Sequence, residues 1–132
     1  MRRGLSEALK AKGYVILDRG TETEASCDYP DYAHAVGADV VAGRAKFGIL
    51  VCTTGIGISI AANKMRGIRA ALVQSADAAG LSRRHNDANV LCFGAKYVDL
   101  PTALMCVEAF LAAEFEAGRH TRRVDKMESS CG

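Results

Sequence analysis

The sequence predicts a doubly wound α/β sandwich, in which helices cover both faces of a parallel sheet. Short apolar runs with strand character alternate along the chain with segments of helical periodicity. The run at residues 47–52, Phe-Gly-Ile-Leu-Val-Cys, is apolar without alternation, which is typical of a strand covered on both faces and predicts a central position. Ligands of such folds bind beyond the carboxyl ends of the strands.

The first half of the chain contains two predicted helices and two predicted strands. Residues 2–12 place apolar side chains on one helical face, and Gly13 follows as a plausible end of that helix. Residues 14–17, Tyr-Val-Ile-Leu, are a short predicted strand. After a polar stretch, Pro30 suits the first turn of a helix that continues to Gly43, and the strand at 47–52 follows.

The second half repeats the alternation. A small-residue turn leads from the 47–52 strand into a helix at 58–65 and a strand at 69–73. Ser75 can cap a helix to about Arg84, residues 90–93 form another strand, and Pro101 opens a long helix through Leu111. Residues 116–132 are charged, and we interpret them as a basic C-terminal tail with a loose end.

Length and composition indicate one globular domain spanning residues 1–132, which excludes a multidomain enzyme. Of the 132 residues, 49% are hydrophobic and 24% are charged. The net charge of +2 is too small to predict nucleic acid as a partner, while phosphorylated small molecules stay open. No apolar run approaches the ~20 residues that cross a bilayer, and no signal peptide is visible. We therefore expect a cytoplasmic protein without a membrane partner.

The five cysteines predict thiols rather than disulfides or a zinc site. Their number is odd, they are scattered, and no Cys-x-x-Cys pair occurs. They are Cys27, Cys52, Cys92, Cys106 and Cys131. Buried or catalytic thiols are the expected state.

The most informative segment is Cys52-Thr-Thr-Gly-Ile-Gly-Ile-Ser59. A thiol at the end of a buried strand is followed by a glycine turn. The backbone amides of this turn, and the N-terminus of the helix after it, can bind an anion and therefore favour a thiolate. This combination suits proton abstraction next to a carbonyl, with the amides binding the enediolate oxygen. The alternative is a buried cysteine before an ordinary turn. The segment is neither a dinucleotide fingerprint nor a phosphate loop, so NAD and ATP are not predicted.

A second candidate segment is Ser82-Arg-Arg-His-Asn-Asp-Ala-Asn89. His85 is flanked by groups that can fix its tautomer, so it could move a proton between sugar oxygens near neutral pH. The alternative is a helix end capped by Asn86 or Asp87.

A third candidate is the run Gly118-Arg-His-Thr-Arg-Arg123. Arg119 and Arg123 are four residues apart and would share one helical face, where two guanidinium groups can bind a phosphate dianion. The alternative is a solvated basic tail.

Together these motifs resemble the ribose-5-phosphate isomerase B family, which includes the galactose-6-phosphate isomerase subunits. The matching segments are Asp28-Tyr-Pro-Asp-Tyr-Ala33, Cys52 to Lys64, His85-Asn-Asp-Ala-Asn-Val-Leu91 and Gly118 to Val124. The resemblance implies an enzyme of the pentose phosphate pathway that interconverts ribose 5-phosphate and ribulose 5-phosphate through an enediolate, without metal or organic cofactor. It also implies a Rossmann-like, flavodoxin-like subunit in a homodimer, or a larger tetramer, with active sites at the interface.

The resemblance also assigns roles residue by residue. Cys52 looks like the base that moves the proton between two carbons, and Thr54 and His85 would assist ring opening. Tyr32 and Asn86 would contact the sugar, and Arg119 with Arg123 would bind phosphate across the dimer interface. The amides of the anion hole would belong to Gly55, Ile56, Gly57, Ile58 and Ser59.

The chain departs from the family pattern in two places. The family's first strand, which ends in an Asp-His pair, is missing before residue 1, and a flavodoxin-like order would put it between the 14–17 and 47–52 strands. We therefore expect a shortened isomerase with impaired activity. Thr53 stands where glycine is common, and a positive φ there would strain a threonine.

Two other functions share these features. One is an isomerase of six-carbon phosphates, such as allose or galactose 6-phosphate, with the same machinery. The other is a non-catalytic subunit that binds sugar phosphate, which the missing strand favours and the retention of Cys52, Thr54 and His85 opposes.

Overall fold

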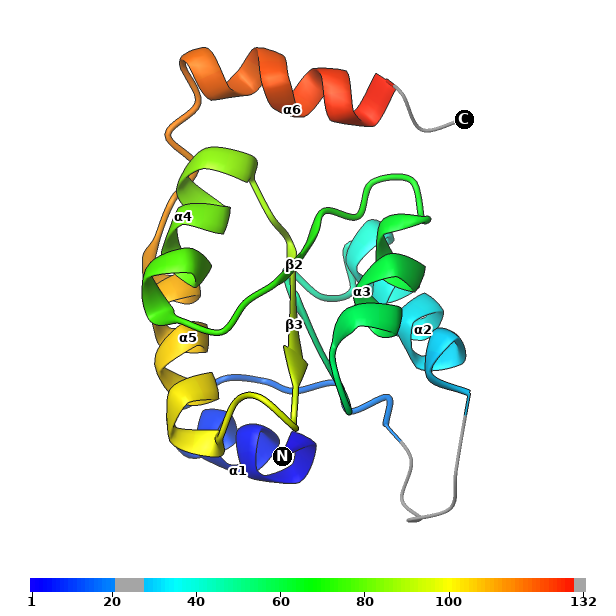
Figure 1. Cartoon of the computed structure of the whole chain (residues 1–132), viewed down its shortest axis with the longest axis vertical. Coiled ribbons are helices and arrows are strands. Elements are labelled where there is room, and N and C mark those ends of the chain that lie inside the picture. Colours follow the sequence, from blue (N-terminus) through cyan, green and yellow to red (C-terminus); the bar gives the residue numbers. More distant parts are fainter. Residues whose placement is uncertain (21–27, 130–132) are drawn as a thin grey trace.

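A computed structural model describes residues 1–20 and 28–129 of the chain. In these residues a parallel three-stranded sheet lies between two layers of helices, which confirms the predicted α/β fold (Figure 1). The strands are β1 (Gly48–Cys52), β2 (Ala70–Leu72) and β3 (Val90–Gly94). The helices are α1 (Arg2–Ala11), α2 (Tyr29–Val41), α3 (Ile56–Asn63), α4 (Ala76–Asn86), α5 (Leu100–Ala112) and α6 (Arg119–Ser129). None of the described helices is long and apolar enough to span a membrane.

The sheet has the order β1-β3-β2, with both pairs parallel. The register aligns Gly48 with Val90 and Cys52 with Gly94, so both strands end at the same level. Every residue of β3 is buried, because this strand has a neighbour on each side and helices on both faces. The prediction that the 47–52 strand is central was therefore wrong for the described residues, in which β1 pairs with β3 alone. A flavodoxin-like sheet would keep these strands in chain order, whereas here β3 lies between β1 and β2.

Two hydrophobic cores fill the space between the layers. One lies on the side of α1, α4 and α5, and the other on the side of α2 and α3 (Figure 1). Phe93 and Leu91 point into the first core, whereas Val90 and Cys92 point into the second, as alternation along a strand requires. The uniformly apolar sequence of β3 thus serves both cores at once.

Residues 14–17 do not form the predicted strand. They have no regular secondary structure, and the side chain of Val15 is 93% exposed. The composition suits a strand, but a strand exists only when its amides and carbonyls pair with a neighbour, and none of the described residues supplies one. Only Ile16 packs against the first core. The polar stretch that follows, with Cys27, lies partly outside the described residues.

Helix ends agree with the predicted signals at three places. Pro30 lies in the first turn of α2. The Ser75 hydroxyl accepts a hydrogen bond from the amide of Ala78 at 3.2 Å and caps α4. Pro101 opens α5, whose N-terminal cap is Asp99. Local signals of this kind need no tertiary context.

Helix α6 replaces most of the predicted C-terminal tail. Its inward side buries His120 and Val124, and Glu128 near its end forms an ion pair with Arg69, which precedes β2. A charge run is usually solvated, but these contacts supply the packing that a short helix needs. In Figure 1, α6 crosses the end of the sheet opposite the head of the β3 arrow, which is the end where the strands begin.

A buried carboxylate connects the segment before residue 20 to α2. Asp39 is 4% exposed, and its oxygens accept hydrogen bonds from the guanidinium groups of Arg19 and Arg44, each at 2.8 Å at the closest. Hydrogen bonds from these two groups lower the pKa of Asp39 to about 2. The carboxylate therefore stays ionised in the fold well below the pH at which it would protonate in an unfolded chain.

This pKa shift predicts a loss of stability in acid. The unfolded chain binds a proton at Asp39 near pH 3.8 and the folded chain near pH 2, so the stabilisation is complete above about pH 5 and is lost as the pH falls toward 2. Asp39→Asn should show a smaller drop in the free energy of unfolding between about pH 5 and 3, measured by urea titration. Asp31→Asn, an exposed change on the same helix, is the control and should keep the wild-type drop. Equal drops in all three proteins would contradict this assignment.

Candidate active site

Cys52 ends β1, and its sulfur accepts a hydrogen bond from the backbone amide of Gly55 at 3.1 Å. The turn that returns this amide to the sulfur depends on Gly55, which adopts φ +77° and is buried. A side chain there would meet the backbone of Phe93 and Gly94 at 2.8 Å. The end of β3 therefore packs directly under the turn and fixes the position of the thiol.

Cys52 differs from the other described cysteines in its surroundings. Burial raises the pKa of Cys92 to about 12 and also raises the pKa of Cys106, so both remain inert thiols. Cys52 is half-buried, lies at a strand end and contacts a backbone amide. Among the described cysteines it alone combines access with a donor that stabilises negative charge.

The amides of the predicted anion hole divide into engaged and available donors. The amide of Gly55 points to the Cys52 sulfur, that of Ile56 donates to the Thr54 hydroxyl at 3.2 Å, and that of Ser59 donates to the Gly55 carbonyl. The Ser59 hydroxyl donates to the Ile56 carbonyl at 2.7 Å. No side chain caps α3, so in the described part of the chain the amides of Gly57 and Ile58 keep their donors for an incoming anion.

An aromatic residue that we did not predict lies over this turn. The phenol of Tyr29, at the start of α2, approaches Gly57 so closely that a side chain at Gly57 would meet its oxygen at 2.4 Å. Tyr32, the predicted sugar contact, is half-buried one turn further along α2. Their spacing of three residues on one helix would have identified Tyr29 as a companion of Tyr32. Thr53 raises no strain, because it is not among the described residues with positive φ.

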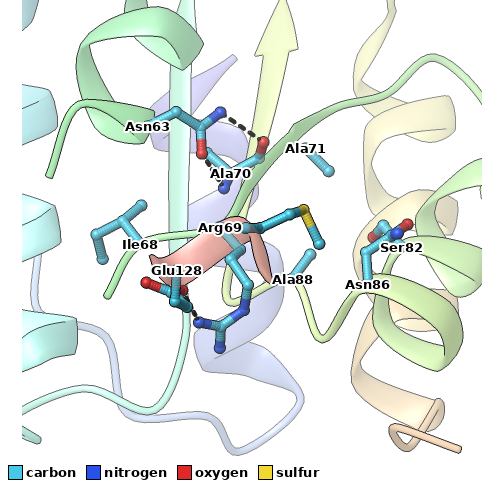
Figure 2. A pocket seen from close by; sticks show the side chains of 10 residues that line it. Asn63, Ile68, Arg69, Ala70, Ala71, Ser82, Asn86, Ala88 and Glu128 are labelled. Atoms are coloured by element: carbon cyan, nitrogen blue, oxygen red, sulfur yellow. Dashed lines mark hydrogen bonds and ion pairs between the residues drawn. The ribbon is translucent and has the colours of Figure 1, made fainter. Parts of the chain in front are cut away.

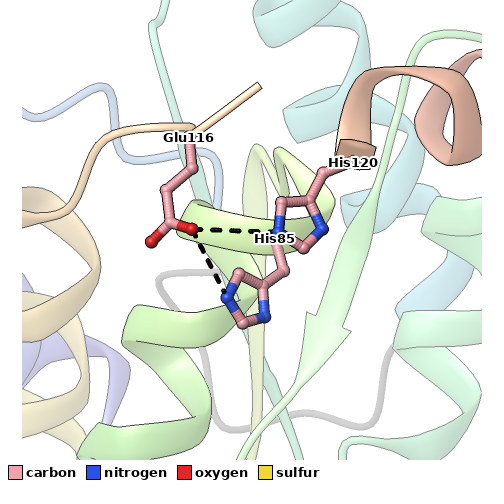
Figure 3. Close-up of side chains that lie close together, drawn as sticks. All are labelled: His85, Glu116 and His120. Atoms are coloured by element: carbon pink, nitrogen blue, oxygen red, sulfur yellow. Dashed lines mark ion pairs between the residues drawn. The ribbon is translucent and has the colours of Figure 1, made fainter. Parts of the chain in front are cut away.

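The second group of candidate residues lies at the end of α4. His85 and Asn86 form its last residues, and Asp87 closes the helix in the left-handed conformation with φ 50°. The imidazole of His85 stacks on that of His120, with ring centres 4.4 Å apart and planes 13° apart. Glu116 completes the group, with one carboxylate oxygen 3.7 Å from Nε2 of His85 and 3.8 Å from Nε2 of His120 (Figure 3). Neither Glu116 nor His120 was predicted as a site residue from the sequence.

Arg119 and Arg123 lie in the first two turns of α6, beside this group. Both side chains are exposed, and neither forms an ion pair with any residue of the described segments. The pKa of His120 is lowered, mainly by burial and to a smaller extent by the neighbouring His85 and Arg119. This ring is therefore neutral near pH 7. The second group therefore offers two available guanidinium groups next to neutral imidazole.

The two groups lie at opposite ends of the sheet. Cys52 stands at the carboxyl end of β1, about 13 Å along the strand from Gly48 at its start. Helix α4 runs back from the carboxyl end of β2 over about 15 Å and delivers His85 near the start of β3. The structure thus brings Cys52, Thr54 and the turn amides together, and separately His85, Asn86, Arg119 and Arg123, but it does not unite the groups within one chain.

A pocket of about 360 Å³ lies between β2, α4 and α6, near the second group. Figure 2 shows Arg69 at its centre, paired with Glu128, and Asn63 bonded to the backbone of Ala70. Arg69 also pairs with Asp87 at 3.3 Å, so its charge is already neutralised. Asn86 lines this pocket, but Cys52 and His85 do not. We therefore do not assign the candidate site to this pocket.

Comparisons with known proteins match this chain to one family. The sequence model described as Ribose/Galactose Isomerase matches residues 1–127, so the chain belongs to that family. It is similar to ribose-5-phosphate isomerase B of Escherichia coli (strain K12), with 49% identity over 117 residues, covering 89% of this chain and 78% of the relative.

Solved structures agree with this assignment. Ribose-5-phosphate isomerase B of Clostridium thermocellum superposes on this chain with a TM-score of 0.94 at 46% identity. The match covers 96% of this chain and 86% of the Clostridium thermocellum chain. The enzyme of Mycoplasma genitalium with bound ribulose-5-phosphate gives a TM-score of 0.91 at 43% identity, with coverage of 96% and 85%.

The conformation of Gly55 predicts a stability test with a matched control. Gly43 has nearly the same φ, +79° against +77°, but a side chain there would meet nothing within 4 Å. Gly43→Ala should cost about 1 kcal/mol of unfolding free energy from backbone strain alone. Gly55→Ala should cost at least about 1 to 3 kcal/mol more, because the added carbon also meets backbone atoms that cannot rotate away. Urea unfolding that gives equal losses would show that the turn is not packed as described.

Proposed function

We propose that this chain is an aldose–ketose isomerase that interconverts ribose 5-phosphate and ribulose 5-phosphate, the sugar chemistry of the pentose phosphate pathway. The observation that carries the proposal is the half-buried Cys52 sulfur, bonded to the Gly55 amide beside the uncapped N-terminus of α3. The relative from Mycoplasma genitalium, which holds ribulose-5-phosphate in its crystal structure, supports this choice of substrate.

The proton transfer follows from the position of the Cys52 sulfur. Cys52 removes the proton from carbon 2 of the open-chain aldose and returns it to carbon 1, while a hydroxyl proton moves from the oxygen on carbon 2 to the oxygen on carbon 1. The electron pair released at carbon 2 forms the enediolate, whose negative oxygen the amides of Gly57 and Ile58 can bind. No redox partner is needed, because the oxidation of one carbon balances the reduction of the other.

The remaining residues bind and open the sugar. Thr54, whose hydroxyl lies in the same turn as Cys52, and His85 exchange protons with the ring oxygen and the hydroxyl on carbon 1 during ring opening. Tyr32 and Asn86 contact sugar hydroxyls. The exposed guanidinium groups of Arg119 and Arg123, one helical turn apart, bind the phosphate dianion.

This assignment requires a second copy of the chain. The sheet separates Cys52 from His85 and the arginine pair by about the length of a strand, which is too far for one bound pentose phosphate to reach both groups. A homodimer of two-fold symmetry resolves this, because the Cys52 end of one copy then faces the His85 end of its partner, and two equal sites form. The reduced thiol that the mechanism needs suits a reducing compartment, and we place the enzyme in the cytoplasm.

Replacing the proposed base tests the chemistry directly. Cys52→Ala should lower kcat for ribose 5-phosphate by at least about 10² to 10⁴, because general base catalysis is lost, while KM stays within severalfold. Turnover is measured by the absorbance of the ketose product, and folding by circular dichroism. Thr53→Ala, an exposed change at the next residue, is the matched control and should retain most activity. Turnover like that of the wild type in Cys52→Ala would exclude the thiol from the mechanism.

Mixing two inactive variants tests the division of the site. After subunit exchange in equal amounts, Cys52→Ala and His85→Ala should regain about one quarter of wild-type turnover, because half of the dimers are mixed and each holds one intact site of two. Cys52→Ala mixed with Thr54→Ala is the control and should regain nothing, since both changes damage the same half. If neither mixture recovers, the two halves do not combine across an interface.

A further inference from the structure

The cluster of His85, Glu116 and His120 brings three metal-binding side chains together from two elements and the loop between α5 and α6. Their ligand atoms all lie within 4.8 Å of one another. Figure 3 shows the carboxylate of Glu116 facing both imidazoles. The two separations from this carboxylate, 3.7 and 3.8 Å, exceed hydrogen-bonding distance, so no hydrogen bond joins the carboxylate to either imidazole.

The donor set matches the preference of zinc and related divalent transition metals. Two imidazole nitrogens and one carboxylate oxygen form a three-residue site that leaves a fourth position open. Bonds of about 2.0 to 2.2 Å require donors about 3.3 Å apart, so the widest pair must close by about 1.5 Å. His120 is buried and therefore held in place, whereas Glu116 is exposed and His85 is half-exposed. The side chains of Glu116 and His85 can therefore rotate, so that the stacked rings and the carboxylate turn toward one metal ion.

The backbone keeps the three side chains together. The amide of Glu116 donates to the carbonyl of Arg84 at 2.9 Å, which ties the loop to the end of α4. Ala117 and Gly118 both have φ of 56°, and this left-handed turn starts α6 so that His120 lies over His85. Tethering of this kind reduces the entropy lost when three ligands converge on one ion.

Neighbouring charges influence the affinity that we expect this cluster to have for a metal ion. The guanidinium group of Arg84 lies 3.8 Å from the second carboxylate oxygen of Glu116, and Arg119 and Arg123 are close enough to act on His120. These positive charges oppose a cation, so binding should be weaker than at a closed structural zinc site. The site is therefore suited to reversible occupancy.

We propose that His85, Glu116 and His120 form a reversible site for a divalent transition metal of the zinc class, and that its occupancy inhibits the enzyme. The binding step rests on this cluster alone. The inhibition rests on the proposed function, because a metal bound at Nε2 of His85 occupies the lone pair that would carry the proton during ring opening.

Binding is tested with Co²⁺ and Zn²⁺ on the untagged wild-type protein and three variants. Wild-type protein should give Co²⁺ ligand-field absorption without thiolate charge-transfer bands, and Zn²⁺ should displace the ion. His120→Gln and Glu116→Gln should each weaken binding at least about tenfold, whereas His34→Gln, an exposed histidine on α2, should not. Equal affinity in all four proteins, or thiolate bands in the wild type, would overturn the proposal. Glu116→Gln is exposed, so it keeps the test valid if His120→Gln fails to fold.

Inhibition is tested by turnover of ribose 5-phosphate with and without Zn²⁺. Zn²⁺ should lower wild-type turnover, a chelator should restore it, and Glu116→Gln should resist the same Zn²⁺ concentration. Equal inhibition of wild type and Glu116→Gln would overturn the inhibitory role. In a further outcome, the protein binds Co²⁺ as described and yet fails to turn over ribose 5-phosphate in metal-free buffer. This result would support the metal site and contradict the proposed function instead.

Discussion

The parallel pairing of β1 with β3 is the constraint on which the rest of the structure depends. Because the strands run in the same direction, the connection between them must carry the chain back along the sheet, and α3 and α4 do so. Each reactive group is consequently placed by its position relative to a strand. Cys52 is the last residue of a strand, whereas His85 precedes one, and this difference separates them by about the length of a strand.

The close contact between Gly55 and the end of β3 fixes the surroundings of the Cys52 sulfur. Two backbones approach where no side chain intervenes, and the approach aims one amide at the Cys52 sulfur. Gly94 contributes in the same way, since a side chain there would meet the Thr54 carbonyl at 2.2 Å. Backbone contacts therefore fix the end of β1, whereas the His85 group combines the buried His120 with the more exposed His85 and Glu116.

Local signals in the sequence predicted most elements, and long-range contacts explain the failures. The cap at Ser75, the proline at residue 30 and the apolar run before Cys52 act over a few residues, so their effects can be read directly. Residues 14–17 have the composition of a strand, but pairing depends on a neighbour that composition does not reveal. Helix α6 is held by burial of His120 and Val124 and by the ion pair between Arg69 and Glu128, which are 59 positions apart. The meeting of His85 with Glu116 and His120 likewise follows from tertiary structure.

The separation of Cys52 from His85 also has a consequence for the free subunit. On the proposed arrangement, a newly synthesised chain carries every reactive group and still lacks a working site until it meets a second copy. Specific activity then depends on protein concentration, and dilution below the dissociation constant of the dimer makes the enzyme inactive without unfolding it. On the same proposal, assembly of two folded chains is the last step before the enzyme becomes active.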